Sequence, residues 1–161
     1  MVSNEGTMKR SLLCLLLIAA SRCAATSPST ADSEDIREAV FRYQFQHNAS
    51  GQQQAAKVYC LSIGAHQDPS NELMKRFANN NPPVRKVSVC DSSRLKGVID
   101  KQTPQGVLIF RVESISFRSV TEATVTGGYY EGPDSSSGNT YTVRKVNGAW
   151  KVVEDKMNWI S

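Results

Sequence analysis

The feature that most constrains this chain is an Asn147-Gly148 pair set between two runs of residues that favour β-strands. Such a pair predicts a two-residue type I′ turn, because both residues tolerate a positive φ angle. The turn fixes the register of the hairpin, so that Val143 should face Val152. The residues that then share one face are largely apolar: Tyr141, Val143, Trp150 and Val152. This agreement supports the predicted pairing.

After this hairpin the apolar positions change parity. They continue at Val153, Met157 and Trp159 rather than at the positions that alternate with Val152. A β-bulge shifts the alternation of a strand by one residue. A bulge or bend near Glu154 would therefore restore a continuous apolar inner face to the last strand.

Upstream, residues 107–110 are apolar at every position, which is typical of a strand covered on both faces. The strand should continue to Phe117, turn at 119–121 and return along 122–131. A three-residue loop would pair Phe117 with Ala123. Gly127-Gly128 predicts a bend in the returning strand, and the Gly, Pro and Ser content of 132–138 predicts a flexible, exposed loop. The stretch 106–159 is thus expected to be a four-stranded antiparallel meander with one face covered.

The first residues have the pattern of an export signal. A basic Met8-Lys9-Arg10 precedes a nine-residue apolar run, Leu12–Ala20, which is too short to span a bilayer. Small residues follow, and cleavage after Ala25 would leave a secretory signal peptide over 1–25. Translation could also start at Met8, because the leader pattern begins there. Lipidation at Cys23, as in a bacterial lipoprotein, is the alternative to free export, although Arg22 stands where a small residue is usual.

Cleavage at Ala25 would remove two of the four cysteines and leave Cys60 and Cys90. In an oxidising compartment these two thiols are expected to form a disulfide; two buried free cysteines are the alternative. Cys60, Cys90 and His66 could instead ligate a metal, but the export signal favours the disulfide. No cofactor is expected. We predict localisation to the periplasm or the extracellular space, with membrane anchoring only if Cys23 is lipidated.

Length and charge set further limits. The 161 residues suit a leader (1–25), a Ser/Thr-rich tether (26–32) and one α+β domain (33–161). The predicted leader holds three of the 19 basic and one of the 15 acidic residues, so the rest of the chain carries a net charge of +2. Basic stripes interleaved with aromatic residues are missing, which argues against a nucleic-acid partner.

The domain should begin with an amphipathic helix, capped by Asp32 or Ser33 and ending near His47-Asn48. Its apolar face is formed by Ile36, Ala39, Val40 and Tyr43, and widened by Phe41 and Phe45. A strand over 57–63 and a short helix opened by Asp68-Pro69 follow. Another strand is predicted over 84–90, and the segment 91–105 is polar and predicted to be irregular.

An N-terminal helix over a curved antiparallel sheet resembles the cystatin-like α+β roll, the architecture of the nuclear-transport-factor-two-like and ketosteroid-isomerase-like superfamily. The segments that carry the resemblance are Ile36–Val40 and the closing hairpin Tyr141–Val153. The resemblance implies a pocket between the helix and the sheet, used for binding or for catalysis. It supplies no catalytic residues, because the isomerase pattern of Tyr and Asp matches no positions here.

Polar residues on the predicted helix and strands are the candidates to line that pocket: Tyr43, Arg111, Tyr129, Tyr141 and Asp155. A carboxylate in such a cavity can act as a base, but sheet tyrosines usually pack and strand charges usually face water. We therefore expect a non-catalytic binding or accessory protein for a small molecule, peptide or protein partner, with dimerisation through the sheet as one option. The alternative is a small ketosteroid-isomerase-like enzyme performing acid–base chemistry in an apolar pocket.

Overall fold

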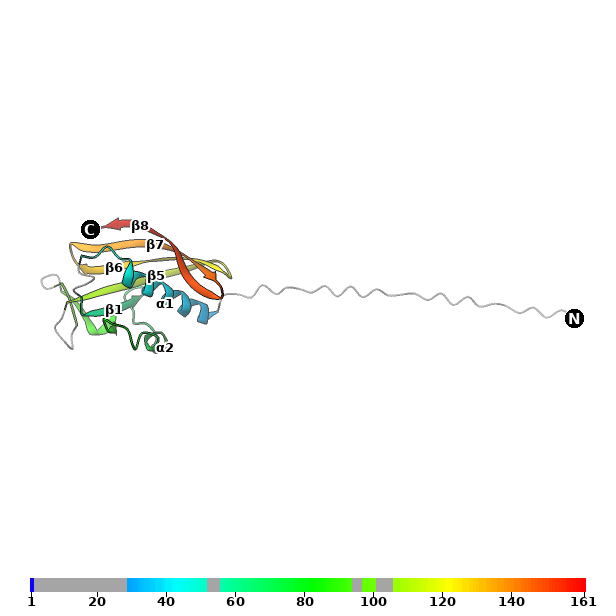
Figure 1. Ribbon diagram of the computed structural model, residues 1–161, viewed down its shortest axis with the longest axis horizontal. Helices are drawn as coiled ribbons and strands as arrows, with labels where there is room; N and C mark the ends of the chain where they lie inside the picture. Colours follow the sequence, from blue (N-terminus) through cyan, green and yellow to red (C-terminus); the bar gives the residue numbers. More distant parts are fainter. Residues whose placement is uncertain (2–28, 52–55, 94–96, 101–105) are drawn as a thin grey trace.

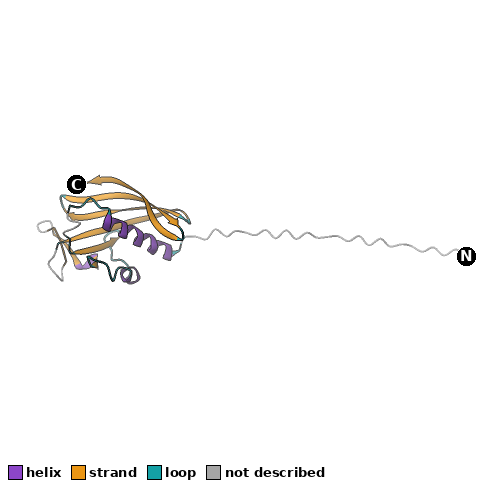
Figure 2. Ribbon diagram, in the orientation of Figure 1, coloured by secondary structure: helices purple, strands orange, loops and turns teal. Residues whose placement is uncertain are grey.

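The computed structural model describes residues 29–51, 56–93, 97–100 and 106–161, together with Met1. A helix lies across one face of a six-stranded sheet, and a second sheet of two strands accompanies it (Figures 1 and 2). The predicted combination of an N-terminal helix with a mostly antiparallel sheet is therefore confirmed.

The helices are α1 (Thr30–Gln46), the short α2 (Asn71–Lys75) and the 3-10 turn η1 (Val87–Val89). The strands are β1 (Val58–Ile63), β2 (Val84–Lys86), β3 (Cys90–Ser93), β4 (Gly97–Asp100), β5 (Val107–Ser119), β6 (Glu122–Gly132), β7 (Ser135–Val146) and β8 (Ala149–Ile160). The large sheet has the order β2-β1-β5-β6-β7-β8, and β3 pairs with β4. Strand β1 runs parallel to both β2 and β5, so the expectation of an antiparallel sheet is correct only from β5 to β8.

The meander of β5 to β8 follows the prediction closely. Asn147 and Gly148 have φ angles of 52° and 80°, and the hairpin pairs Val143 with Val152. The β5–β6 hairpin pairs Phe117 with Ala123 as predicted, but Ser119 pairs with Glu122, so the loop has two residues rather than three, and a register shift between Phe117 and Ser119 restores the predicted pairing. The register of both hairpins is therefore set by local turn chemistry together with the apolar alternation.

The predicted bulge in β8 is present, but its consequence differs from the prediction. Thr142 pairs with Glu154 and Val143 with Val152, so Val153 is the extra residue. The shift places Asp155 opposite Tyr141 on the inner face. Val153, Met157 and Trp159 are 46%, 46% and 50% exposed, and a second register shift, between Gly138 and Asn139, changes the alternation again before Trp159. The expected continuous apolar inner face is wrong, because Asp155 lies on it, although Met157 does line the pocket on this face.

Helix α1 begins earlier than its sequence pattern indicates. Its N-cap is Ser29, whose side chain forms a capping box with Asp32, so the predicted cap at Asp32 or Ser33 lies one turn late. Residues 29–32 of the predicted tether thus belong to the cap and first turn. Residues 26–28 and the predicted leader, Met1 excepted, lie outside the described residues. The helix ends at His47 as expected.

The main core fills the space between α1 and the inner face of the sheet. Phe41, Phe110 and Leu61 are fully buried there, and Phe45 packs against Tyr59 and Phe110 with ring centroids 4.9 and 5.2 Å apart. From α2 and the turn after it, Leu73 and Phe77 close the side of this core near β1. Burial of these rings is the main force that holds α1 on the sheet.

A second, smaller core covers the outer face of β1 and β5. Alternate residues of these strands, such as Cys60 and Ile109, pack there against Val87 and Val98. This explains why residues 107–110 are apolar at every position. The cover comes from η1, β3 and β4. The strand predicted over 84–90 is correct only for 84–86, which form β2. The irregular segment predicted over 91–105 is wrong for 91–93 and 97–100, which are strands, while 94–96 and 101–105 lie outside the described residues.

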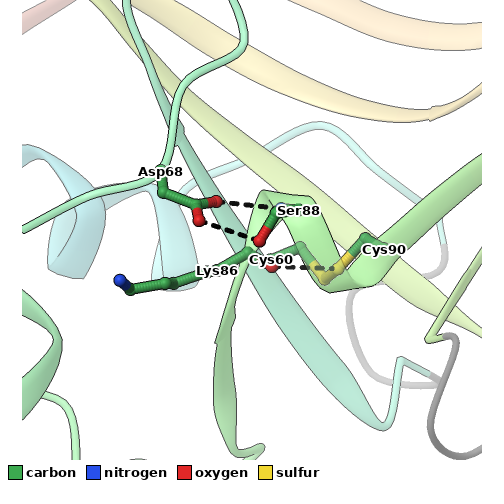
Figure 3. Close-up of a disulfide and its surroundings, with 5 residues drawn as sticks. All are labelled: Cys60, Asp68, Lys86, Ser88 and Cys90. Atoms are coloured by element: carbon green, nitrogen blue, oxygen red, sulfur yellow. Dashed lines mark hydrogen bonds between the residues drawn. A yellow bond between two sulfur atoms is a disulfide. The ribbon is translucent and has the colours of Figure 1, made fainter. Parts of the chain in front are cut away.

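The disulfide between Cys60 and Cys90 is present, with Cα atoms 6.6 Å apart, and attaches this outer cover to β1 (Figure 3). Asp68 lies beside it. Its carboxylate accepts hydrogen bonds from the Ser88 backbone N–H and hydroxyl, at 2.9 and 2.8 Å. Asp68 was predicted to cap the short helix, but Ser70 does so, accepting from the Leu73 N–H.

The predicted exposed loop at 132–138 is instead a tight hairpin, with β6 ending at Gly132 and β7 beginning at Ser135. Ser136 exchanges backbone hydrogen bonds with Ser161 at the end of the chain. A Cβ added to Gly138 would meet the indole of Trp159. Glycine and serine occur here because strands and an aromatic ring approach closely, whereas the composition alone suggested a loop.

Candidate functional site

A pocket of about 230 Å³ lies between the C-terminal end of α1 and the inner face of β6, β7 and β8. It is at the small end of ligand sites, of the size that suits a compact molecule. Its lining residues are Gln44, His47, Asn48, Ala49, Gly128, Tyr129, Ser137, Asn139, Tyr141, Asp155 and Met157.

Gln44 is a polar residue on the buried stripe of α1. Its Nε2 lies 3.0 Å from the Arg111 carbonyl oxygen, 3.4 Å from the Gly128 carbonyl oxygen and 3.2 Å from the Tyr141 hydroxyl. Because the two carbonyls can only accept, the amide nitrogen must point towards them, which fixes the orientation of the side chain. Its Oε1 is buried and has no hydrogen-bond partner among the described residues. A buried acceptor of this kind is unusual and is a place where a ligand or water would bind favourably.

Tyr141 is nearly fully buried beside Gln44. Burial raises the pKa of its hydroxyl well above the ordinary value of 10, so the group is a neutral phenol at physiological pH. Since the Tyr141 oxygen accepts from Gln44, its proton remains available for donation. Tyr43 packs edge-on against the same ring, with centroids 5.9 Å apart.

Asp155 reaches the pocket because of the bulge at Val153. Its carboxylate accepts a hydrogen bond of 2.7 Å from the Asn139 side-chain amide, and Asn139 in turn accepts from the Ser137 hydroxyl at 2.8 Å. The pKa of Tyr43 is raised, first by partial burial and then by the charge of Asp155 and a hydrogen bond to it. Asp155 is therefore positioned by a neutral donor on β7, close to Tyr43 on α1.

His47 forms part of the rim at the end of α1. Its ring stacks on Tyr43 with centroids 4.3 Å apart, and its Nδ1 lies 3.1 Å from the Tyr43 carbonyl oxygen. Asn48 donates to the Gln44 carbonyl at 2.8 Å. These contacts end the helix and hold its last turn over the pocket.

The structure places four of the five candidate residues together. Tyr129, Tyr141 and Asp155 line the pocket, and Tyr43 borders it. Arg111 does not join them, because it shares the outer face of β5 with Ile109. There it lies in a separate hollow with His66 and Tyr130, and its guanidinium donates to the Ser137 carbonyl at 3.3 Å. The parity of β5 separates Arg111 from the pocket.

Sequence reasoning missed Gln44 and Asn139. Gln44 follows Ile36 and Val40 at four-residue steps, and a polar residue at such a position in an apolar stripe is a usable signal. Asn139 has the same parity as Tyr141, but it follows directly after the segment that was predicted to be a loop. Ser137 lies within that predicted loop and was missed because the segment was not expected to be a strand.

The chemistry of the pocket is that of polar recognition. Among the described residues that line it, Asp155 is the one acidic side chain and none is Lys or Arg. Over the described part of the chain, no group of three His, Cys, Asp or Glu could hold a metal ion. The alternative set of Cys60, His66 and Cys90 does not apply, because both cysteines are in the disulfide.

The disulfide indicates a non-reducing environment for the folded protein. Among the described residues, none of the helices has the length and apolar character needed to cross a bilayer. Comparison with protein-family models, with curated proteins and with solved structures finds no match to this chain.

Proposed function

We propose that this protein is an exported α+β roll of the cystatin-like type that binds a small molecule, without catalysis, in the pocket between α1 and the sheet. The observation that carries the proposal is the pocket itself: a cavity of about 230 Å³ on whose walls Gln44, Tyr141 and Asp155 meet. Gln44 Oε1 adds a buried acceptor for which the described part of the chain supplies no donor.

Two further features support the proposed setting. The segment from Met8 to Ala25 has the composition of a secretory leader, and the Cys60–Cys90 disulfide fits an oxidising compartment. A single helix lying across a sheet of consecutive antiparallel strands supports the roll architecture. Cleavage of the leader and lipidation at Cys23 would both be visible in the mass of the exported protein.

A non-catalytic role is favoured by how the polar groups are already engaged. The Asp155 carboxylate accepts from Asn139, and burial keeps the Tyr141 phenol neutral. A phenol that stays protonated cannot serve as a general base, and Asp155 is held by its contact with β7. The contacts instead hold donors and acceptors in fixed directions, as a binding site requires.

The test is binding of a defined set of small ring compounds to the full-length, disulfide-bonded protein, measured by NMR shift changes and calorimetry. The set is benzylamine, benzyl alcohol and benzoate. We expect at least one to shift the signals of residues that line the pocket. Ala49→Trp should abolish the effect by filling the pocket mouth, whereas Ala78→Trp, on an exposed turn after α2, should not. The absence of any binding, or binding that survives Ala49→Trp, would overturn the proposal.

The second candidate is the ketosteroid-isomerase-like enzyme, and one observation favours it. Asp155 lines the open pocket, and its charge raises the pKa of the nearby Tyr43 phenol, so a carboxylate and a phenol lie close to each other. Such a pair could remove a proton next to a ketone. If it does, the protein will exchange the α-hydrogens of cyclohexanone with deuterated water faster than Asp155→Asn does. Equal exchange rates would exclude this candidate for small ketones.

A further inference from the structure

We propose that the pocket takes a small organic cation, a protonated primary amine whose ammonium group lies at Asp155. The inference rests on the proposed function and deepens it by naming the class of ligand. It follows from three properties of the pocket wall: its charge, its free acceptors and its aromatic surface.

The first property is an uncompensated negative charge. Asp155 accepts a hydrogen bond from the neutral Asn139 amide and forms no ion pair within 4.0 Å in the described parts of the chain. The nearest basic residues along β7 are used elsewhere: Arg144 pairs with Glu122 at 2.7 Å and Lys145 with Asp32 at 2.9 Å. A carboxylate in a partly enclosed site without a cation attracts a positively charged ligand and repels an anion.

The second property is the supply of acceptors. An ammonium group has three donors and no acceptor, so it needs several oxygens around it. Asp155 offers carboxylate oxygens, and the buried Gln44 Oε1 has no partner among the described residues. Both residues line the same pocket. A primary amine could satisfy both, whereas a carboxylate ligand would leave Gln44 Oε1 unpaired.

The third property is the aromatic wall. Tyr129 and Tyr141 line the pocket, and Tyr43 with His47 stacked on it borders the rim. The faces of aromatic rings attract cations, and they also bury the apolar part of an amine. The negative charge, the acceptors and the aromatic wall of the pocket therefore all favour the same class of ligand, a protonated primary amine.

The experiment compares three ligands of nearly equal shape in the full-length, oxidised protein at pH 7: benzylamine, benzyl alcohol and benzoate. Calorimetric titration should show benzylamine binding roughly tenfold or more tightly than benzyl alcohol, because a charge-assisted hydrogen bond is about twice as strong as a neutral one. Benzoate should bind more weakly than either.

Two variants connect this preference to the pocket. Asp155→Asn keeps the shape and the hydrogen bond from Asn139, and should reduce benzylamine affinity to that of benzyl alcohol while leaving the alcohol unaffected. Glu154→Gln is the matched control, because it removes a neighbouring carboxylate that accepts from Thr142 on the outer face. It should leave the preference for benzylamine intact.

The outcomes separate the two proposals. If benzyl alcohol and benzylamine bind equally, or if the preference survives Asp155→Asn, the cation inference is wrong while the binding pocket stands. If benzoate binds most tightly, the inference is likewise wrong. If none of the three compounds binds, the proposed function falls together with it.

Discussion

At the scale of single residues, Asp32 connects the two ends of the fold. Its carboxylate caps α1 by accepting from the Ser29 N–H, and the same group accepts from Lys145 Nζ at 2.9 Å and from Trp150 Nε1 at 3.0 Å on the last hairpin. The Lys145 hydrogen bond, followed by those from Ser29 and Trp150, lowers the pKa of Asp32 well below its ordinary value of 3.8. The first turn of the helix is thereby anchored to the β7–β8 turn.

This lowered pKa gives a prediction for acid stability. A carboxyl whose pKa is lower in the folded state contributes stability above its unfolded pKa, and this contribution is lost as the pH falls through the folded value. The melting temperature of the native protein should therefore exceed that of Asp32→Asn by a constant margin from pH 7 to about 5. Below pH 4 the margin should shrink. Thermal unfolding at several pH values measures it, and a margin that is unchanged at pH 3 would contradict the assignment.

Gln44 gives a second prediction at this scale. Replacing it with leucine leaves the carbonyls of Arg111 and Gly128 without their donor, so Gln44→Leu should lower the free energy of unfolding by about 1–3 kcal/mol. Gln46→Leu, on the exposed side of the same helix, is the matched control and should change little. Chemical denaturation compares the two. Equal effects would mean that the amide of Gln44 does not stabilise the fold.

At the scale of secondary-structure elements, β6 is shaped by close approach to its neighbours. A Cβ on Gly127 would meet the backbone carbonyl of Arg111 in β5, and one on Gly128 would meet that of Ser137 in β7. Neither glycine has a positive φ, so space rather than backbone angle requires them. The β5–β6 register shifts beside these glycines, but the extra residue lies in β5, between Val112 and Ser114, so the bend predicted in β6 stays a prediction.

The third prediction tests this packing. Gly128→Ala would push the β7 backbone away and should cost about 1–3 kcal/mol or more, as overpacking does. In Gly132→Ala the new methyl group meets nothing within 4 Å, so its effect should be within about 0.5 kcal/mol of zero. Urea denaturation of both variants measures these changes in the free energy of unfolding. A neutral Gly128→Ala would show that the two strands can separate at no cost.

At the scale of the whole molecule, two covers enclose the central strands. Helix α1 lies over the inner face (Figure 1), and η1 with β3 and β4 covers the outer face of β1 and β5. The disulfide connects the outer cover to β1 across a separation of 30 residues. The dimer through the sheet face stays a prediction, which light scattering of the purified protein would test.

The fourth prediction concerns this cross-link. Closing a loop of this size stabilises a protein by about 3–4 kcal/mol in the chain-entropy estimate. The double variant Cys60→Ala/Cys90→Ala should therefore unfold more easily by that amount. Reducing agent should destabilise the native protein similarly and leave the double variant unchanged. If reduction does not alter the denaturation midpoint, the disulfide adds no stability.

The sequence by itself determined the features that depend on residues close together along the chain. The Asn147-Gly148 turn, the alternation of Tyr141 and Val143, and the apolar face of α1 are local patterns, and the hairpins and the helix follow from them. The pairing of Cys60 with Cys90 could also be predicted, because only two cysteines remained once the leader was set aside.

Tertiary structure alone decided which polar groups meet. Asp155 enters the pocket because one extra residue at Val153 changes its face, and Arg111 leaves it because β5 presents that position to the other side. The parallel placement of β1 and the outer cover from β3 and β4 depend on contacts between distant segments. Composition cannot show such contacts, since the same serines and glycines suit a loop or a closely packed strand.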